Sequence, residues 1–147
     1  MTQTIQDAQN EIVEEFEAFG DWQERYAHII QLGKELGDIP EEFKEEKYRV
    51  KGCQSTVYLV SKMDGDEVAF DATSDAMIVR GLIALLLRVY NHRTPREIVE
   101  TPPTFIQDLG LAENLTQGRA NGLQAMIEQI KNYALAFETL MKSRENQ

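Results

Sequence analysis

Apolar side chains recur every three to four residues through the first quarter of the chain, and this spacing predicts two amphipathic helices. The first is expected over residues 5–19 and ends at a glycine. The second is expected over residues 21–37, because Asp21 followed three positions later by Glu24 is typical of an N-terminal cap with its return partner. The polar and acidic segment 37–47 contains a proline and predicts a loop or a short helical turn.

Two segments rich in β-branched and aromatic residues, 56–63 and 67–72, predict the strands of a hairpin. The Asp-Gly-Asp sequence at 64–66 between them is typical of a tight turn. Residues 48–50 are expected to add a third strand. We therefore predict an α+β fold in which a small antiparallel three-stranded sheet packs against several helices. Residues 52–55, with the sequence Gly-Cys-Gln-Ser, then lie at the corner between the first two strands.

The next segment predicts the central helix of the core. Ser74 is a suitable N-cap, and Asp75 in the first turn is favourably placed against the helix dipole. Residues 78–89 are apolar almost all round, as in a helix buried on every side. The apolar stretch 76–87 is interrupted by Arg80 and is much shorter than the roughly 20 residues that a membrane span needs. A buried helix is therefore expected here.

Two short helical segments and one long helix are expected after it. Residues 94–97, Thr-Pro-Arg-Glu, are typical of a capped helix start. A pair of prolines then breaks the chain, and residues 104–111 predict one or two short turns. Thr116 is expected to open the last helix, and its tail 143–147 is expected to fray. No internal repeat is visible, so residues 1–147 are predicted to form one domain.

The chain is strongly acidic, with 15 Lys and Arg against 25 Asp and Glu and a formal net charge of −10. This charge repels phosphate backbones and anionic lipid headgroups, so neither nucleic acid nor a membrane is expected as a partner. Residues 1–17 mix apolar and acidic side chains, which does not fit a secretion signal. A single cysteine cannot form an internal disulfide, and we expect a reducing, cytoplasmic location.

Cys53 is the one thiol of the chain and the main candidate for chemistry. Lys47, Arg49 and Lys51 precede it as a local basic run, and nearby cations favour the thiolate, which is the nucleophilic form. Gly52 permits backbone conformations that help to present the next residue at a strand end. Taken alone, however, a lone cysteine is more often a small buried apolar residue, and lysines on an edge strand discourage edge pairing. Position alone leaves both interpretations open.

Several motifs resemble one family in the same order along the chain. They are Val50-Lys51-Gly52-Cys53-Gln54-Ser55-Thr56-Val57-Tyr58, Ser74-Asp75-Ala76, Ile78-Val79-Arg80-Gly81-Leu82-Ile83-Ala84, Thr94-Pro95 with Ile98-Val99, Leu115-Thr116 with Arg119, and Gly122-Leu123 with Ala125-Met126-Ile127. Together they resemble the SufE family of cysteine desulfuration proteins and extend over most of residues 22–134. One departure is Thr73, where many members have a second acidic residue, and we expect it to affect loop dynamics or docking rather than the cysteine motif.

The resemblance implies an α+β fold shared with iron–sulfur scaffold proteins. It also implies a sulfur carrier, rather than a stand-alone enzyme, that takes persulfide sulfur onto Cys53 from a pyridoxal-phosphate (PLP)-dependent cysteine desulfurase and stimulates that enzyme. The sulfur is then delivered to an iron–sulfur scaffold complex for cluster assembly. The cofactor belongs to the desulfurase, and the chain itself is expected to need no cofactor or metal. Asp75 and Arg119 are carried over as supporting residues.

Simpler and different interpretations stand beside this one. Arg119 is equally consistent with a solvated surface arginine, and Asp75 with a helix-start residue. A different class is a cysteine hydrolase with Cys53 as nucleophile and His28 or His92 as base, although no local signature supports it. A scaffold that assembles clusters itself is disfavoured, because one thiol cannot supply the usual set of cysteine ligands.

Overall fold

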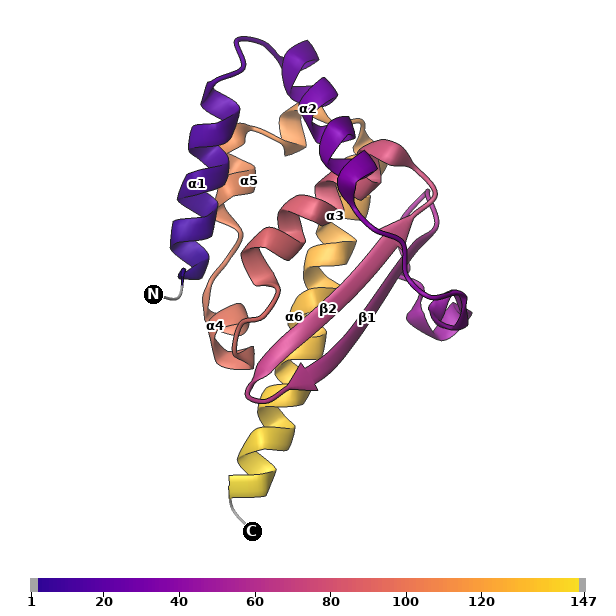
Figure 1. Ribbon diagram of the computed structural model, residues 1–147, viewed down its shortest axis with the longest axis vertical. Coiled ribbons are helices and arrows are strands. Elements are labelled where there is room, and N and C mark those ends of the chain that lie inside the picture. Colours follow the sequence, from indigo (N-terminus) through magenta and orange to yellow (C-terminus); the bar gives the residue numbers. More distant parts are fainter. Residues whose placement is uncertain (1–2, 146–147) are drawn as a thin grey trace.

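The helix α3 lies at the centre of the fold in the computed structural model, which describes residues 3–145 (Figure 1). Nine of its 14 residues are buried, as its almost uniformly apolar sequence predicts. Three helices and one strand pack against it. These elements are α3 (Met77–Tyr90) itself, α1 (Ile5–Glu17), α2 (Trp22–Glu35), α6 (Gln117–Glu145) and β2 (Glu67–Ser74).

Two glycines allow α2 and α3 to cross with their backbones in contact. A Cβ on Gly33 would overlap the carbonyl oxygen of Met77, and a Cβ on Gly81 would overlap a backbone carbonyl of α2. Arg80 fastens this crossing, because its Nε donates to the Gly33 carbonyl at 3.0 Å and its Nη2 donates to the Leu36 carbonyl. The last carbonyls of α2 are therefore satisfied by a cation from the neighbouring helix.

The predicted hairpin is confirmed. Strands β1 (Val57–Asp64) and β2 pair antiparallel, with Asp64 opposite Glu67 and a tight turn in which Gly65 has φ of 66°. Such a positive φ favours glycine, which explains the Asp-Gly-Asp sequence of the turn. One face of the hairpin packs on α3 and α6, and residues of all four elements border the same small apolar space.

The predicted third strand is wrong, because the sheet in the described part of the chain has two strands. Residues Glu46–Tyr48 form the short 3-10 helix η2, so the chain is still coiled where the strand was expected to begin. Arg49 then makes an isolated bridge to Tyr58, and the Val50 N–H donates to the Val57 carbonyl at 2.8 Å. The chain leaves the sheet directly afterwards, since Gly52 has φ of 92°.

The predicted cap of α3 is also wrong. Ser74 pairs with Val57 in the ladder and ends β2, and α3 begins only at Met77. The Ser74 hydroxyl accepts the Ala76 N–H at 3.2 Å, which turns the chain between strand and helix instead of capping the helix. Asp75 consequently lies before the first turn of α3, and its carboxylate takes a different partner, described below.

The other predicted helix starts are borne out in the described residues. Asp21 caps α2 by accepting the Glu24 N–H at 2.8 Å, and the Glu24 carboxylate returns to Gly20. Thr94 and Glu97 form a full capping box at the start of the next helix. The remaining elements are α4 (Pro95–Glu100), α5 (Thr104–Leu109), which ends at the left-handed Gly110, and the 3-10 helices η1 (Glu41–Phe43) and η3 (Ala112–Asn114).

The last helix, α6, is 29 residues long, and its final turns extend beyond the rest of the molecule (Figure 1). Leu140 in this extension is 52% exposed. The tail predicted to fray, 143–147, is helical as far as Glu145, and its last two residues lie outside the described part of the chain. Between residues 3 and 145, none of the helices combines the length and the hydropathy that crossing a membrane requires.

Candidate functional site

Cys53 lies on the loop between Val50 and β1, and its side chain faces α6. The thiol is half-buried, and its Sγ lies 3.6 Å from the Gly122 carbonyl oxygen, to which the S–H donates. Gly122 lies directly beside the thiol, and a Cβ there would be in ordinary van der Waals contact with Sγ at 3.5 Å. The loop therefore rests on the helix at a point where the helix has no side chain.

A cavity of about 410 Å³ opens beside the thiol. Its apolar floor comes from α3 and α6, including Val79, Leu82 and Met126, and its polar rim includes Gln54, Thr116 and Arg119. An apolar recess with a few polar groups at its mouth is the usual form of a small-ligand or reactive site. The cavity has room for more than the thiol itself, so a group added to Sγ can be accommodated.

Asp75 closes the base of the Cys53 loop. Its Oδ1 accepts the Thr56 N–H at 3.1 Å, and its own N–H donates to the Thr56 carbonyl at 3.3 Å. This reciprocal pair continues the β1–β2 ladder by one step and fixes the residue at which the loop ends. The helix-start interpretation of Asp75 is therefore replaced by a loop-anchoring contact.

Arg119 lies in the first turn of α6 and borders the cavity that holds Cys53. Arg119 is exposed, and within residues 3–145 its side chain makes no hydrogen bond or ion pair. A guanidinium in this position is free to bind an anion that enters the cavity mouth.

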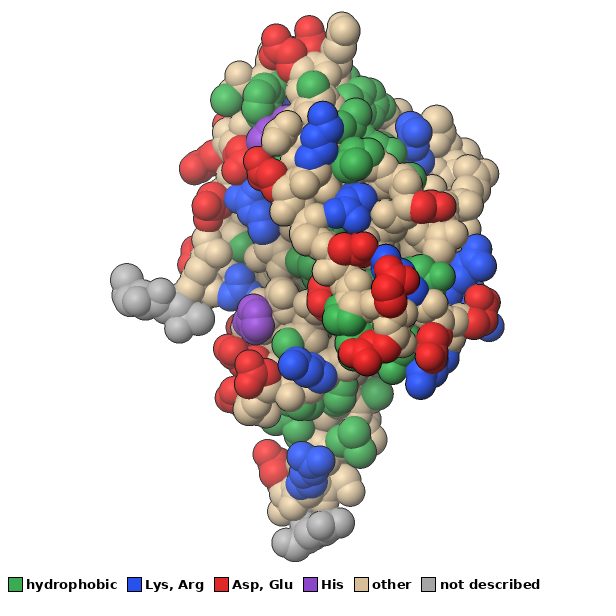
Figure 2. Space-filling model, turned by 45° about the vertical axis from the view of Figure 1, so that its right-hand side comes forward, with side chains coloured by type: hydrophobic (Ala, Val, Ile, Leu, Met, Phe, Trp, Pro, Cys, Tyr) green, Lys and Arg blue, Asp and Glu red, His purple; other side chains and the backbone are tan. Residues whose placement is uncertain are grey.

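The electrostatic prediction for the thiol holds only in part, because a nearby cation does favour the thiolate but burial opposes it more strongly. Burial raises the pKa of Cys53 above its ordinary value, and the charge of Arg49 only partly offsets this by lowering it. Lys47 and Arg49 lie within 3.7 Å of the carboxylates of Glu45 and Glu46, so acidic neighbours screen the basic run. Figure 2 shows basic and acidic side chains interspersed on the face turned forward, without a patch of one sign. Burial therefore outweighs the cations and favours the protonated thiol in this conformation.

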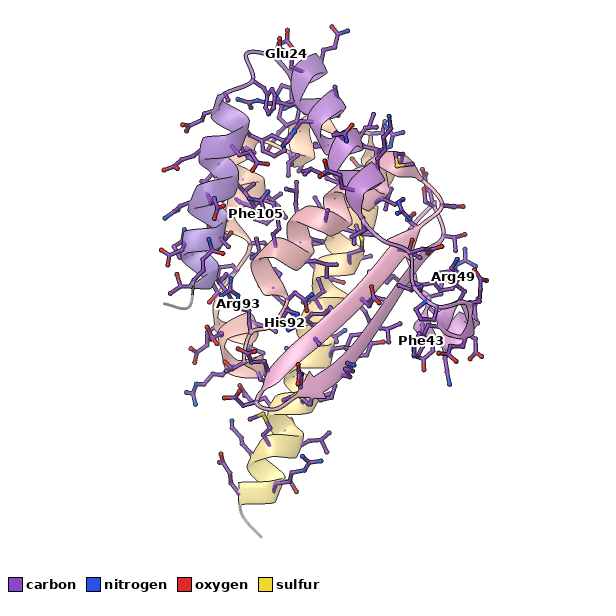
Figure 3. All side chains as sticks on the ribbon, viewed as in Figure 1. Glu24, Phe43, Arg49, His92, Arg93 and Phe105 are labelled. Atoms are coloured by element: carbon purple, nitrogen blue, oxygen red, sulfur yellow. The ribbon has the colours of Figure 1, made fainter. Side chains whose placement is uncertain are left out.

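The structure does not bring either histidine to Cys53. His28 Nε2 lies 2.7 Å from the Glu15 carboxylate and packs against the rings of Phe16 and Phe19. His92 borders a separate cavity and lies beside Arg93, away from the loop that carries Arg49 (Figure 3). No histidine lines the cysteine cavity as the structure describes it. The hydrolase alternative therefore lacks its base, because a Cys–His pair has to be within hydrogen-bond reach.

Thr73, the departure from the family pattern, is buried and accepts a hydrogen bond from Arg80 Nη1 at 2.7 Å. Hydrogen bonds from Lys44 and from the Ile39 backbone lower the pKa of Asp38, and the Thr73 hydroxyl adds a smaller lowering. Thr73 therefore links the α2–α3 crossing to β2, two residues before the loop anchor Asp75. Among residues 3–145, no three His, Cys, Asp or Glu side chains gather as a metal site requires.

Sequence reasoning missed the contact between Gln54 and Gly118. A Cβ on Gly118 would overlap the Gln54 side-chain amide, which lies directly on the helix backbone there. The available signal is the spacing of Gly118 and Gly122, since positions four apart lie on one face of a helix. These two glycines make the flat surface on which the Cys53 loop rests.

Comparison with known proteins finds a matching family model and several relatives. The family model described as "SufE: Fe-S metabolism associated domain" matches residues 10–134. An uncharacterized SufE-like protein of Synechocystis sp. is 39% identical over 127 residues, which are 86% of this chain and 80% of that protein. An uncharacterized SufE-like protein of Rhizobium meliloti is 38% identical over 130 residues, 85% of this chain and 93% of that one.

The fold is also found among solved structures. The solution structure of a hypothetical protein from Thermus thermophilus superposes with a TM-score of 0.74 and covers 90% of this chain and 96% of that one. The two sequences are 22% identical, so this similarity concerns the fold alone. It supports the α+β architecture, whereas the expected likeness to iron–sulfur scaffold proteins stays a prediction.

Proposed function

This chain belongs to the SufE family, a family of iron–sulfur metabolism, and on that premise we propose that Cys53 accepts sulfane sulfur from a cysteine desulfurase and passes it on. The observation that carries the proposal is the half-buried thiol on a loop beside a cavity with room for one added atom. The whole chain is assigned to this role as one domain.

The transfer step follows the chemistry of thiol–disulfide exchange. The Cys53 thiol loses its proton to a base or to water, and its thiolate attacks the outer sulfur of a persulfide on the donor enzyme. The bond between the two donor sulfurs breaks, a new S–S bond forms on Cys53, and the donor cysteine leaves as a thiolate. No net oxidant or reductant is consumed, because the sulfane sulfur moves as a unit.

The resting geometry protects the product of this step. A persulfide is acidic and readily oxidised, so an exposed one is lost to side reactions. With the loop resting on α6, an added sulfur would face the cavity beside the apolar side chains of Val79 and Leu82, which shield one side of it from solvent. Because burial raises the pKa of the Cys53 thiol, the free protein reacts slowly with other electrophiles until a partner opens the loop.

The supporting residues have separate roles in this scheme. Arg119 at the cavity mouth stabilises the negative charge of the attacking thiolate and of the finished persulfide. Asp75 holds the end of the loop through Thr56 and so sets how easily the thiol leaves the cavity.

The PLP cofactor belongs to the desulfurase, which is stimulated when its persulfide is removed. The downstream acceptor is an iron–sulfur scaffold complex, and the setting is the cytoplasm.

Intact-mass analysis after incubation with a PLP-dependent desulfurase and cysteine tests the proposal. We expect a gain of one sulfur atom that a thiol reductant removes, and no gain in the Cys53→Ser variant. An Arg119→Gln variant is expected to gain sulfur about tenfold more slowly, in line with the loss of one charge-assisted contact. Sulfur retained by Cys53→Ser, or no sulfur on the wild-type chain, would overturn the assignment.

A further inference from the structure

The side chain that follows the cysteine lies across the first turn of α6. Gln54 borders the cavity, and its Oε1, Cδ and Nε2 atoms occupy the space where a Cβ of residue 118 would stand. The Gln54 amide can lie there because Gly118 has no side chain. Gln54 is itself exposed, so its amide forms part of the rim, whereas the neighbouring thiol is half-buried.

Few other contacts hold the loop on α6. Among residues 3–145, the one hydrogen bond from residues 53–55 to the helix is the bond from the Cys53 thiol to the Gly122 carbonyl. A thiol is a weak donor, so this bond alone holds the loop poorly. The ends of the loop are fixed elsewhere, by the bond between Val50 and Val57 and by the pair of Thr56 and Asp75. The middle of the loop can therefore move while its ends stay in place.

We propose that the Gln54 side chain seated on Gly118, the Gln54 latch, holds Cys53 in its cavity, and that a sulfur donor must displace this side chain to reach the thiol. Gln54 is a positioning residue that acts through the thiol next to it. The purpose of the latch rests on the proposed function, but its mechanical action does not. A donor loop approaching from solvent meets the exposed Gln54 amide before it meets the half-buried Sγ.

Gly118→Ala separates the latch from general stability. The atoms that the new methyl would meet belong to the far end of a flexible side chain, so the Gln54 amide moves and the backbone does not. Alanine is also a better helix former than glycine, which strengthens the first turn of α6. The variant should therefore be as stable as the wild type or more so, while its thiol becomes more accessible. Loosening of the whole fold would instead lower the melting temperature.

The test is the rate at which the single cysteine reacts with an aromatic disulfide reagent, measured together with the melting temperature. We expect Gly118→Ala and Gln54→Ala each to react about fivefold faster, as expected for losing one ordinary side-chain contact. The double variant should react no faster than either single variant, because both remove the same contact. Gly37→Ala is the matched control, since its methyl meets no atom within 4 Å.

Wild-type rates in both single variants would overturn the latch, as would additive effects in the double variant or faster reaction that parallels a lower melting temperature. The reagent needs no desulfurase, so the two proposals fail separately. Faster reaction in the variants with no sulfur gained in the mass experiment would support the latch and refute sulfur transfer. Sulfur gained by the wild type with unchanged reagent rates in the variants would support sulfur transfer and refute the latch.

Discussion

Two places in this molecule use glycines for close approach, and they differ in what the glycines meet. At the α2–α3 crossing, a Cβ on Gly33 or Gly81 would overlap backbone carbonyl oxygens, which cannot move without displacing a helix. On α6, a Cβ on Gly118 would overlap a side-chain amide, which can rotate away. The same residue type therefore builds a rigid contact in the core and a movable one at the candidate site.

The difference also appears in the polar contacts around each place. Arg80 ties the crossing together with hydrogen bonds to Gly33, Leu36 and Thr73, and these come from three separate nitrogens. The Cys53 loop is tied to α6 by one weak thiol bond and a side chain laid on glycine. A site that has to expose its sulfur during transfer benefits from this weaker attachment, because local opening costs less than unfolding.

The largest effect is expected from a substitution that breaks the rigid contact. Gly81→Ala should lower the free energy of unfolding by about 3 kcal/mol, because the methyl has to push α2 away from α3 in a packed core. Urea unfolding measures this loss. Gly118→Ala should be as stable as the wild type or more so, and the control Gly37→Ala should change stability by less than about 0.5 kcal/mol, the usual range of surface changes. A Gly81→Ala protein as stable as these two would show that the crossing is not rigid.

An intermediate effect is expected from loosening the base of the Cys53 loop. Asp75→Ala removes the acceptor of the Thr56 N–H and should cost about 1 kcal/mol of stability, the usual worth of such a bond. The Cys53 thiol should also react several-fold faster with a disulfide reagent. Asp71→Ala is a suitable control, because Asp71 lies on the adjoining strand β2 and its carboxylate accepts the Ala72 N–H instead of the Thr56 N–H. Equal thiol rates in the two variants would contradict the anchoring role of Asp75.

The smallest expected effect is a dependence of stability on pH. Burial raises the pKa of Cys53 in the folded protein, so folding favours the protonated thiol. This contribution is fully present below the unfolded pKa of about 8.5 and is lost as pH rises from there through the folded pKa. Above that pH, the free energy of unfolding measured with urea should therefore fall slightly more for the wild type than for Cys53→Ser. Greater alkaline loss in Cys53→Ser would mean that the thiol pKa is lowered.

Local sequence patterns were sufficient for most of the secondary structure. The apolar periodicity of α1, α2 and α3 and the Asp-Gly-Asp turn between β1 and β2 depend on neighbours within a few residues, and each is present. The prediction of a strand at 48–50 was wrong because strand pairing is not decided by neighbours within a few residues. Its β-branched and aromatic character suited a strand, but pairing depends on a partner and on the path of the chain, which turns away at Gly52.

The sequence by itself determined the buried central helix, the hairpin and, through its motifs, the family and the cysteine on which the proposed chemistry depends. Only the tertiary structure decided the partner of Asp75, the seat of Gln54 on Gly118 and the direction in which the pKa of Cys53 is shifted. The physical reason is that these three features arise where segments about 20 to 70 residues apart meet. Neither spacing nor composition encodes that meeting, and desolvation of the thiol exists only after α6 covers it.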